Sequence, residues 1–159
     1  MRKKFNLAEE EYLKAVLALS GKNKAVRTKD VANALGLAPA SATQMLEKMA
    51  KKRLLRHSPY KGVELTQKGR EDAEAVLRRY QLLERFFIEY LRISPSEAAH
   101  QACLMEHFIS KETQRRICQI MKHPEKSMGN KPMPKCRLEK DCDSCMEKFP
   151  APKAGRLLL

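Results

Sequence analysis

The sequence predicts a mainly α protein, with an N-terminal winged helix-turn-helix domain and a second, helical domain behind it. Three observations support this prediction. Apolar residues recur with the period of a helix along most of the chain up to residue 121. Two short helical segments flank a tight turn and are followed at once by a small basic hairpin. A long amphipathic segment comes next, and it is more than such a small domain can cover.

End signals mark the first two predicted helices. The first spans 7–20, where apolar residues recur every three to four positions, and Gly21 ends it. The second spans 29–35, with Thr28 as its N-cap and Gly36 just past its end. The pair is therefore expected to be short, well bounded and close together.

The third helix and the hairpin complete the winged helix-turn-helix. Proline favours the first turn of a helix, so the third helix is predicted to begin at Pro39 and to run to about residue 52. The period then changes, and 54–58 and 63–65 are strand candidates joined by a turn over 59–62.

Three more helices are predicted, followed by an irregular tail. Thr66 can cap a long helix that runs to about Leu91, and Ser94-Pro95 begins another that runs to about Ser110. A last helix ends near residue 121, after which Pro, Gly, Lys and Cys dominate. The predicted domains are a winged-helix domain over 1–70, a helical domain over 71–135 and a cysteine-containing tail over 136–159.

Positive charge is concentrated at the front of the chain. The 159 residues carry a formal net charge of +13, and residues 1–60 hold 13 basic and 5 acidic side chains. A partner with repeated negative charge, above all nucleic acid, would exploit this concentration. A merely basic surface that keeps the protein in solution is the alternative.

No segment of the sequence predicts contact with a membrane. No apolar stretch approaches the ~20 residues of a transmembrane helix. No apolar export signal follows the basic N-terminus. We expect a cytoplasmic protein whose five cysteines are reduced, metal-bound or redox-active.

The third helix is the candidate recognition helix for double-stranded DNA. Small hydroxyl and amide side chains near the N-terminus of such a helix can reach base edges in the major groove, and nearby lysines can contact phosphates. The hairpin tip can touch the backbone beside the groove. The predicted DNA-contacting residues are Thr28, Ser41, Thr43, Gln44, Lys48, Tyr60 and Lys61.

A candidate metal site lies between residues 100 and 107. Cys103, Glu106 and His107 are spaced i, i+3, i+4 and are expected on one face of a helix, with His100 on the same stripe. Thiolate, carboxylate and imidazole form a mixed donor set that suits Fe(II), Mn(II), Co(II), Ni(II) or Zn(II). The alternative is an ordinary solvated Glu-His pair.

The tail holds Cys136, Cys142 and Cys145, which include one C-x-x-C pair. A structural Zn site needs four ligands, and an iron–sulfur centre is a second interpretation. Exposed thiols or a redox disulfide are the remaining ones. Candidates for a fourth ligand are Cys118, His123 and Asp141.

Residues 7–134 resemble the metal-dependent repressors of the diphtheria-toxin-repressor type, which include iron-dependent and manganese-transport regulators. The ordered set of matching motifs is specific. It comprises Glu11-Tyr12-Leu13, the segment PASATQML at 39–46, PYKGVELT at 59–66, Lys68-Gly69, LLERF at 82–86, ACLMEH at 102–107 with Ile109-Ser110, Gly129-Asn130 and Pro132-Met133-Pro134.

The resemblance implies a homodimeric repressor, not an enzyme, that binds a palindromic operator when loaded with a divalent metal. It assigns the activating metal site to Glu11, Cys103, Glu106 and His107. Cysteine at 103 favours Fe(II), because thiolate prefers ions softer than Mn(II), whereas the hard carboxylate of Glu11 keeps Mn(II) as the alternative.

The chain departs from the family at its ancillary metal site. Tyr80 and Ala99 stand where the family has histidines, while Glu84 is kept and His100 is one residue out of register. The second site is therefore either absent or rebuilt around Glu84 and His100. Two other functions stay open: a winged-helix regulator that senses iron–sulfur status through the tail, and a metal-binding protein without a regulatory role.

Overall fold

The computed structural model describes residues 7–21, 25–58 and 61–138. The chain divides into two compact units, whose boundary falls between Leu77 and Arg78, within one long helix. The described part is mainly helical, as predicted, with one small two-stranded sheet. None of its helices is long and apolar enough to cross a membrane.

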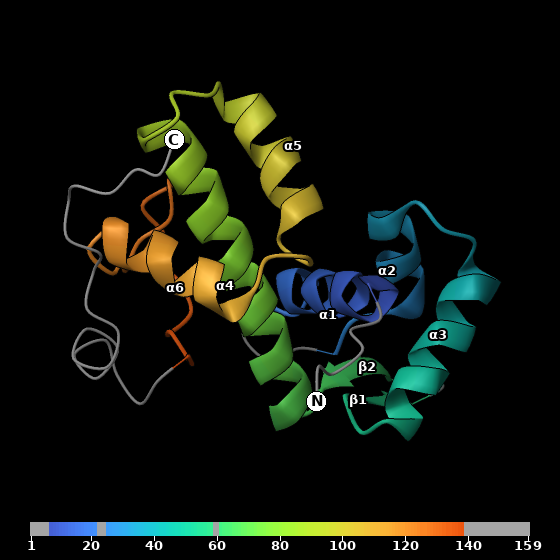
Figure 1. Ribbon diagram of the computed structural model, residues 1–159. Coiled ribbons are helices and arrows are strands. Elements are labelled where there is room, and N and C mark those ends of the chain that lie inside the picture. The colour runs from blue at the N-terminus through green and yellow to red at the C-terminus, as the bar shows by residue number, and fades with distance from the viewer. Residues whose placement is uncertain (1–6, 22–24, 59–60, 139–159) are drawn as a thin grey trace. The chain divides into compact units, whose positions relative to one another are not determined.

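Three helices form the helix-turn-helix of the first unit (Figure 1). α1 spans Leu7–Leu19, α2 Thr28–Leu35 and α3 Pro39–Lys51, so the predicted bounds are correct to within one residue. Gly36 takes a left-handed conformation with φ 65°, and its N–H and that of Leu37 bond to carbonyls of the last turn of α2. This cap sets the tight turn between α2 and α3.

The start of α2 differs from the prediction. Arg27 is the N-cap residue and Thr28 is the first helical residue, so Thr28 does not cap the helix. Arg27 instead forms an ion pair with Asp30 at 2.9 Å, one turn into the helix. The hydroxyl of Thr28 lies 3.5 Å from Nε2 of His57.

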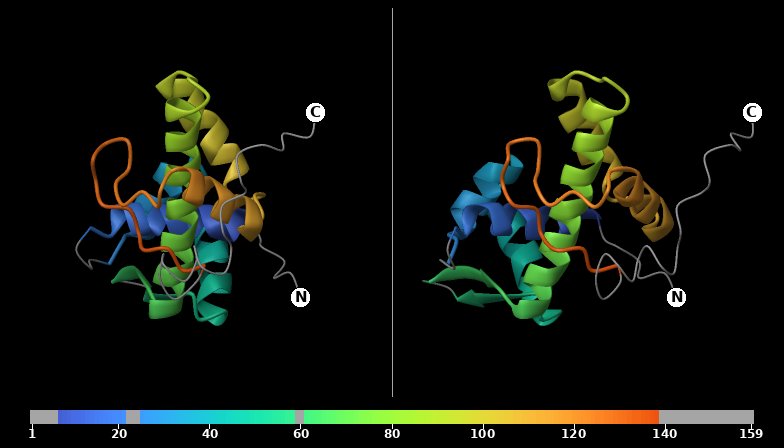
Figure 2. Two further views of the ribbon diagram at one scale, coloured as in Figure 1. Left: turned by 60° about the vertical axis from the view of Figure 1, so that its left-hand side comes forward. Right: turned by 90° about the vertical axis from the view of Figure 1, so that its left-hand side faces the viewer.

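The hairpin, which we call the wing, consists of β1 (Leu55–Ser58) and β2 (Gly62–Leu65) in antiparallel pairing (Figure 2). Val26 adds an isolated bridge to the wing, because its N–H and C=O both pair with Val63 at 2.8 Å. Gly62 has φ 92°, and a Cβ at this position would lie 2.4 Å from the Val26 carbonyl oxygen. The close approach of Val26 to the wing therefore requires glycine at position 62.

One apolar core holds the first unit together. Four of its fully buried side chains come from three elements: Val16 from α1, Leu46 and Met49 from α3, and Val63 from the wing. Burial of this apolar surface fixes the recognition-helix candidate against α1, α2 and β1. The remaining buried members are Tyr12, Leu13, Val26, Val31, Ala32, Ala42, Leu54, Leu55 and Ala73.

α4 spans Gln67–Glu89 and crosses the boundary between the two units. The predicted cap is confirmed, because the Thr66 hydroxyl accepts a hydrogen bond from the Gly69 N–H at 3.0 Å. The same hydroxyl donates to the carbonyl oxygens of Arg53 and Leu54. A single threonine thus joins the start of α4 to the start of the wing.

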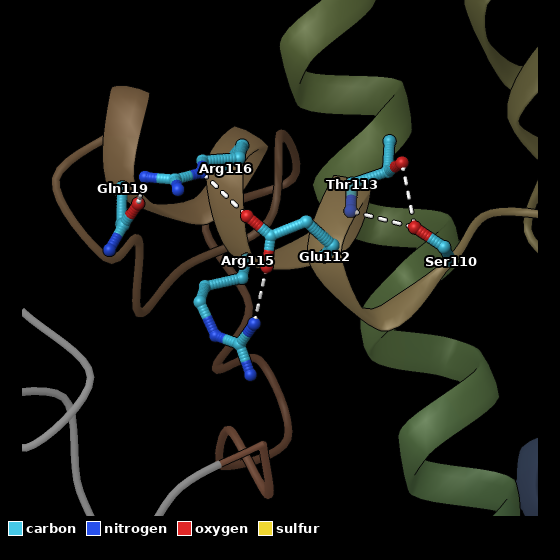
Figure 3. Close-up of polar contacts among 6 residues, drawn as sticks. All are labelled: Ser110, Glu112, Thr113, Arg115, Arg116 and Gln119. Atoms are coloured by element: carbon cyan, nitrogen blue, oxygen red, sulfur yellow. Dashed lines mark hydrogen bonds and ion pairs between the residues drawn. The ribbon is translucent and has the colours of Figure 1, made fainter. Parts of the chain in front are cut away.

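α5 (Pro95–Met105) and α6 (Lys111–Ile120) belong to the second unit. Ser94 is the N-cap of α5 and accepts a hydrogen bond from the Glu97 N–H. Ser110 is the N-cap of α6 and accepts one from the Thr113 N–H (Figure 3). The prediction that α5 continues to about Ser110 is wrong. The helix ends at Met105 with Glu106 as its C-cap residue, and the chain is extended again at Ser110, the N-cap of α6.

The second unit has its own core. Leu82, Leu83 and Phe87 of α4 pack with residues of α5, of α6 and of the segment after it, namely Ala98, Ala102, Ile117, Cys118, Met121 and Met133. From Met121 to residue 138 the chain forms no helix, as predicted (Figure 2). This segment is nevertheless anchored, because Met133 is buried and its N–H donates to the Glu125 carbonyl at 2.8 Å.

Candidate metal centre and DNA-binding surface

The three candidate ligands near the end of α5 do not all lie on one helix, contrary to the prediction. Cys103 lies in the last turn of α5 and is exposed. Glu106 is the C-cap residue and keeps helical backbone angles, while His107 follows in a turn. The α5 C-terminus therefore presents the three side chains from a helix end rather than from a regular helical face.

Glu106 is the centre of this group. Its side chain is fully buried, and its carboxylate lies 3.2 Å from Nε2 of His107. The Cys103 sulfur lies within 4.8 Å of a Glu106 carboxylate oxygen. The trio of Cys103, Glu106 and His107 does not fall within 4.8 Å of one another as a set. Glu106 is therefore close to His107 and to Cys103, while these two are not both part of one compact group of three.

The surroundings of Glu106 suit a cation. Burying an ionised carboxylate is costly unless it is paired or coordinates a metal. The neighbouring Tyr80 reports the same negative environment: burial and a hydrogen bond to Glu84 raise its pKa, and the charges of Cys103 and Glu106 add to this. Thiolate, carboxylate and imidazole together fit Fe(II), Mn(II), Co(II), Ni(II) or Zn(II).

The candidate ancillary ligands are not brought into a metal-binding group. Glu84 accepts a 2.9 Å hydrogen bond from the Tyr80 hydroxyl, and His100 is exposed on α5. Within the described ranges, no group of three or more ligand side chains includes Glu84 or His100. Tyr80 stands at a position where the family has a histidine, and its hydroxyl is thus hydrogen-bonded to the carboxylate of Glu84.

Glu11 belongs to the first unit, in α1. Its side chain is half-buried and forms a 3.2 Å ion pair with Lys14. Glu9, at the start of the same helix, forms an ion pair with Lys52 just past α3. The acidic first half of α1 is thereby tied to the basic end of the recognition-helix candidate.

α3 presents one polar face and one buried face. Ser41, Gln44 and Lys48 are exposed at i, i+3 and i+7, while Ala42, Leu46 and Met49 are buried. This division orients the polar side chains away from the core of the first unit. The helix therefore offers a continuous exposed stripe of hydroxyl, amide and ammonium groups.

The other predicted DNA-contacting residues vary in their exposure. Thr43 is half-buried, and its hydroxyl donates to the Pro39 carbonyl at 2.9 Å, so the hydroxyl proton already has an acceptor within α3. Thr28 is half-buried and Lys61 is exposed at the edge of the wing. Tyr60 lies outside the described residues.

The structure describes only one of the three tail cysteines. Cys136 is half-buried, while Cys142 and Cys145 lie outside the described residues. Cys118 and His123, which the sequence offered only among several fourth ligands, do lie next to each other, with Sγ and Nδ1 3.4 Å apart. Sequence spacing could not reveal this pairing, because the turn after α6 creates it.

Comparisons with known proteins give matches along most of the chain. The family model of the iron-dependent repressor N-terminal DNA-binding domain matches residues 4–63. The model of the iron-dependent repressor metal-binding and dimerisation domain matches residues 66–135.

Individual relatives agree with these matches. An uncharacterised HTH-type transcriptional regulator of Methanocaldococcus jannaschii, MJ0568, is 30% identical over 68% of this chain and 87% of its own. The iron-dependent repressor IdeR of Mycobacterium tuberculosis is 29% identical over 79% of this chain. That match covers 54% of IdeR, so the chain spans about half the length of this relative.

A solved structure extends the likeness to three dimensions. A manganese-dependent transcriptional repressor in complex with manganese is 28% identical and has a TM-score of 0.71, over 79% of this chain and 58% of that one.

Proposed function

Because the chain belongs to the diphtheria-toxin-repressor family of metal-dependent transcriptional repressors, we propose that it represses transcription by binding a palindromic operator as a homodimer. A divalent metal activates it, with Fe(II) favoured and Mn(II) the alternative. The observation that carries this proposal is the fully buried Glu106 carboxylate with an imidazole at 3.2 Å and a thiol nearby. The protein is not an enzyme.

The proposed activating ligands are the four that the family resemblance assigns. Cys103, Glu106 and His107 supply a thiolate, a carboxylate and an imidazole at the end of α5, and Glu11 supplies a second carboxylate from α1. An ion shared by these groups would link the sensing helix to the DNA-binding unit.

Metal preference follows from the single thiolate. Thiolate favours Fe(II) and Co(II) over Mn(II), whereas a carboxylate at the same position hardens the site. Activation itself requires differential affinity, because a ligand shifts a conformational equilibrium only by binding one state better than the other. The metal must therefore bind the DNA-competent state better than the other state.

DNA binding uses the exposed face of α3. Ser41 and Gln44, which are exposed on α3, contact base edges, and the exposed Lys48 and Lys61 contact phosphates. The net charge of +13 supports binding to a duplex. Thr28, Thr43 and Tyr60 complete the proposed contact surface. An isologous dimer matches the two-fold symmetry of a palindromic site.

The metal order of activation tests this function. Cys103→Glu is expected to shift activation of operator binding from Fe(II) or Co(II) towards Mn(II), measured by anaerobic fluorescence anisotropy with each metal. Glu106→Ala and His107→Ala should lose activation by every metal, because too few ligands remain.

The tail provides the control. Replacing Cys136, Cys142 and Cys145 together by Ser should leave the metal order unchanged. If that triple variant abolishes metal-dependent binding while Cys103→Glu changes nothing, sensing resides in the tail and the assignment is wrong. An unselective metal-binding protein would bind each metal without any operator preference.

A further inference from the structure

Arg79 of α4 bonds to the residue at the centre of the candidate metal site. Its Nε donates a hydrogen bond to the main-chain carbonyl oxygen of Glu106 at 2.6 Å. Both residues belong to the second unit, and they lie 27 positions apart in the sequence. A guanidinium is always charged and its donors are fixed in one plane, so this bond is both strong and directional.

The stretch of chain around Glu106 has little apolar packing to hold it. The core of the second unit includes Ala102 of α5, and the next residue that packs against this core is Ile109. In the described stretch between them no side chain belongs to the core, and Phe108 is 78% exposed. A segment with few buried apolar contacts opens locally at low cost. The bond from Arg79 therefore anchors a helix end that packing leaves loose.

The backbone of Glu106 sets the position of its side chain. Glu106 is the C-cap residue of α5, and its N–H bonds to the Ala102 carbonyl at 3.0 Å. Its side chain is fully buried, with the carboxylate 3.2 Å from Nε2 of His107. The peptide groups on both sides of Glu106 are thus hydrogen-bonded. A ligand that is held in place before the ion arrives loses less freedom on binding.

We propose that Arg79 is a positioning residue of the metal centre. It fixes the backbone of Glu106 at the end of α5, so that the buried carboxylate is in place to bind the ion, and it does not touch the ion itself. This inference rests on the proposed function, because it takes Glu106 as a metal ligand. It adds a residue of α4 that none of the candidate ligand motifs contains.

A plain helix cap is the alternative interpretation of the same bond. A cation near the C-terminus of a helix is favourable in its own right, because it pairs with the last carbonyl groups and with the helix dipole. Loss of a plain cap would lower stability without a specific loss of metal ligation. The experiments below separate these two effects.

Cobalt titration of the full chain tests the positioning role. The parent protein is the triple serine variant of the tail cysteines, so that the tail cannot bind cobalt through its thiols. Co(II) is added anaerobically to reduced, chelator-treated protein, and the visible and sulfur-to-cobalt absorption bands report ligation. Arg79→Met keeps the apolar stem and removes the donors, and it should lower Co(II) affinity by about 10–100-fold, as loss of an outer-shell partner does.

Arg85→Met is the matched control. Arg85 also lies on α4 and donates to a main-chain carbonyl oxygen, that of Lys126, at 2.7 Å. Its replacement removes the same kind of bond away from Glu106 and should leave Co(II) affinity unchanged. Circular dichroism and urea unfolding compare the stability of the variants. If Arg85→Met lowers Co(II) affinity as much as Arg79→Met does, the loss reflects general stability and the positioning role is wrong.

Hydrogen exchange of the metal-free protein tests the same role without any ion. Amides in peptides that cover residues 102–108 should exchange faster in Arg79→Met than in the parent, and at the parent rate in Arg85→Met. Unchanged exchange in Arg79→Met would show that the bond does not hold this segment and would overturn the proposal. Arg79→Lys keeps the charge but not the planar fork, and with the same controls it carries both tests if Arg79→Met does not fold.

Glu106→Ala distinguishes failure of this inference from failure of the proposed function. The variant should lose Co(II) binding at this centre. If it does so while Arg79→Met binds Co(II) like the parent, the positioning role alone is overturned. If Glu106→Ala binds Co(II) as tightly as the parent, the metal centre lies elsewhere, and the proposed ligand set is overturned together with the role of Arg79.

Discussion

At the scale of single residues, Gly69 shows how little room the joint between the wing and α4 leaves. A Cβ on Gly69 would lie 1.7 Å from the Leu54 carbonyl oxygen, which is backbone and cannot move aside cheaply. That carbonyl also accepts bonds from the Thr66 N–H and hydroxyl. The contact therefore requires glycine for space and not for an unusual φ angle.

Gly69→Ala is expected to lower the free energy of unfolding by on the order of 3 kcal/mol, because the added methyl group forces backbone to shift. Urea denaturation followed by circular dichroism measures this change. Gly129→Ala is the matched control, since nothing lies within 4 Å of a Cβ there. Equal stability of the two variants would show that the joint relaxes freely.

At the scale of elements, the caps decide where helices begin. The Ser110 hydroxyl accepts the Thr113 N–H at 3.0 Å, and Glu112 in the first turn of α6 pairs with Arg115 and Arg116 (Figure 3). These two arginines lower the pKa of Glu112. The start of α6 is thus stabilised both by a side-chain cap and by two ion pairs.

Ser110→Ala is expected to cost about 1 kcal/mol in thermal or urea unfolding, because the Thr113 N–H loses its acceptor. Ser110→Asp restores an acceptor and should recover most of the loss. A Ser110→Asp variant as unstable as Ser110→Ala would show that the cap contributes nothing.

The recognition-helix candidate makes a second prediction at this scale. Gln44→Ala should relax base preference at one operator position by about 1–3 kcal/mol, if its exposed amide bonds a base edge in two places. Selection from a randomised operator library measures this. Lys48→Ala is the contrast: it should weaken all sequences alike and reduce the salt slope by about 1. An unchanged base preference in Gln44→Ala would remove it from the readout.

At the scale of the whole molecule, apolar side chains remain exposed beside the candidate metal centre. Leu104, Met105 and Phe108 are 53%, 41% and 78% exposed, between α5 and the start of α6. Exposed apolar clusters of this kind mark protein interfaces. In a family whose second domain dimerises, they are the natural surface for a second copy.

Phe108→Asp is therefore expected to convert the dimer to a monomer in light scattering at micromolar concentration, and to weaken binding to a palindromic operator. Met128→Asp changes an exposed methionine on the segment after α6 and should leave the dimer intact. A dimer that persists unchanged in Phe108→Asp would locate the interface elsewhere.

Local signals in the sequence alone determined the helix-turn-helix, the wing and the long α4. Gly36, Pro39 and Thr66 act on backbone within a few residues, so their positions predict element ends to within one residue. The family motif at 102–107 likewise contains all three candidate ligands of the second unit. The end of α5 at Met105 was not predicted, because no glycine or proline marks it in the sequence.

Only the tertiary structure decided the rest. The burial of Glu106, the bridge from Val26 to Val63 and the approach of His123 to Cys118 all depend on contacts between residues distant in sequence or on the path of a turn. Periodicity carries no information about such contacts, since it reports which face of an element is buried and not what lies against it. The cysteines thus indicated metal chemistry, and the fold decided which of the described thiols is buried beside an imidazole, namely Cys118 beside His123.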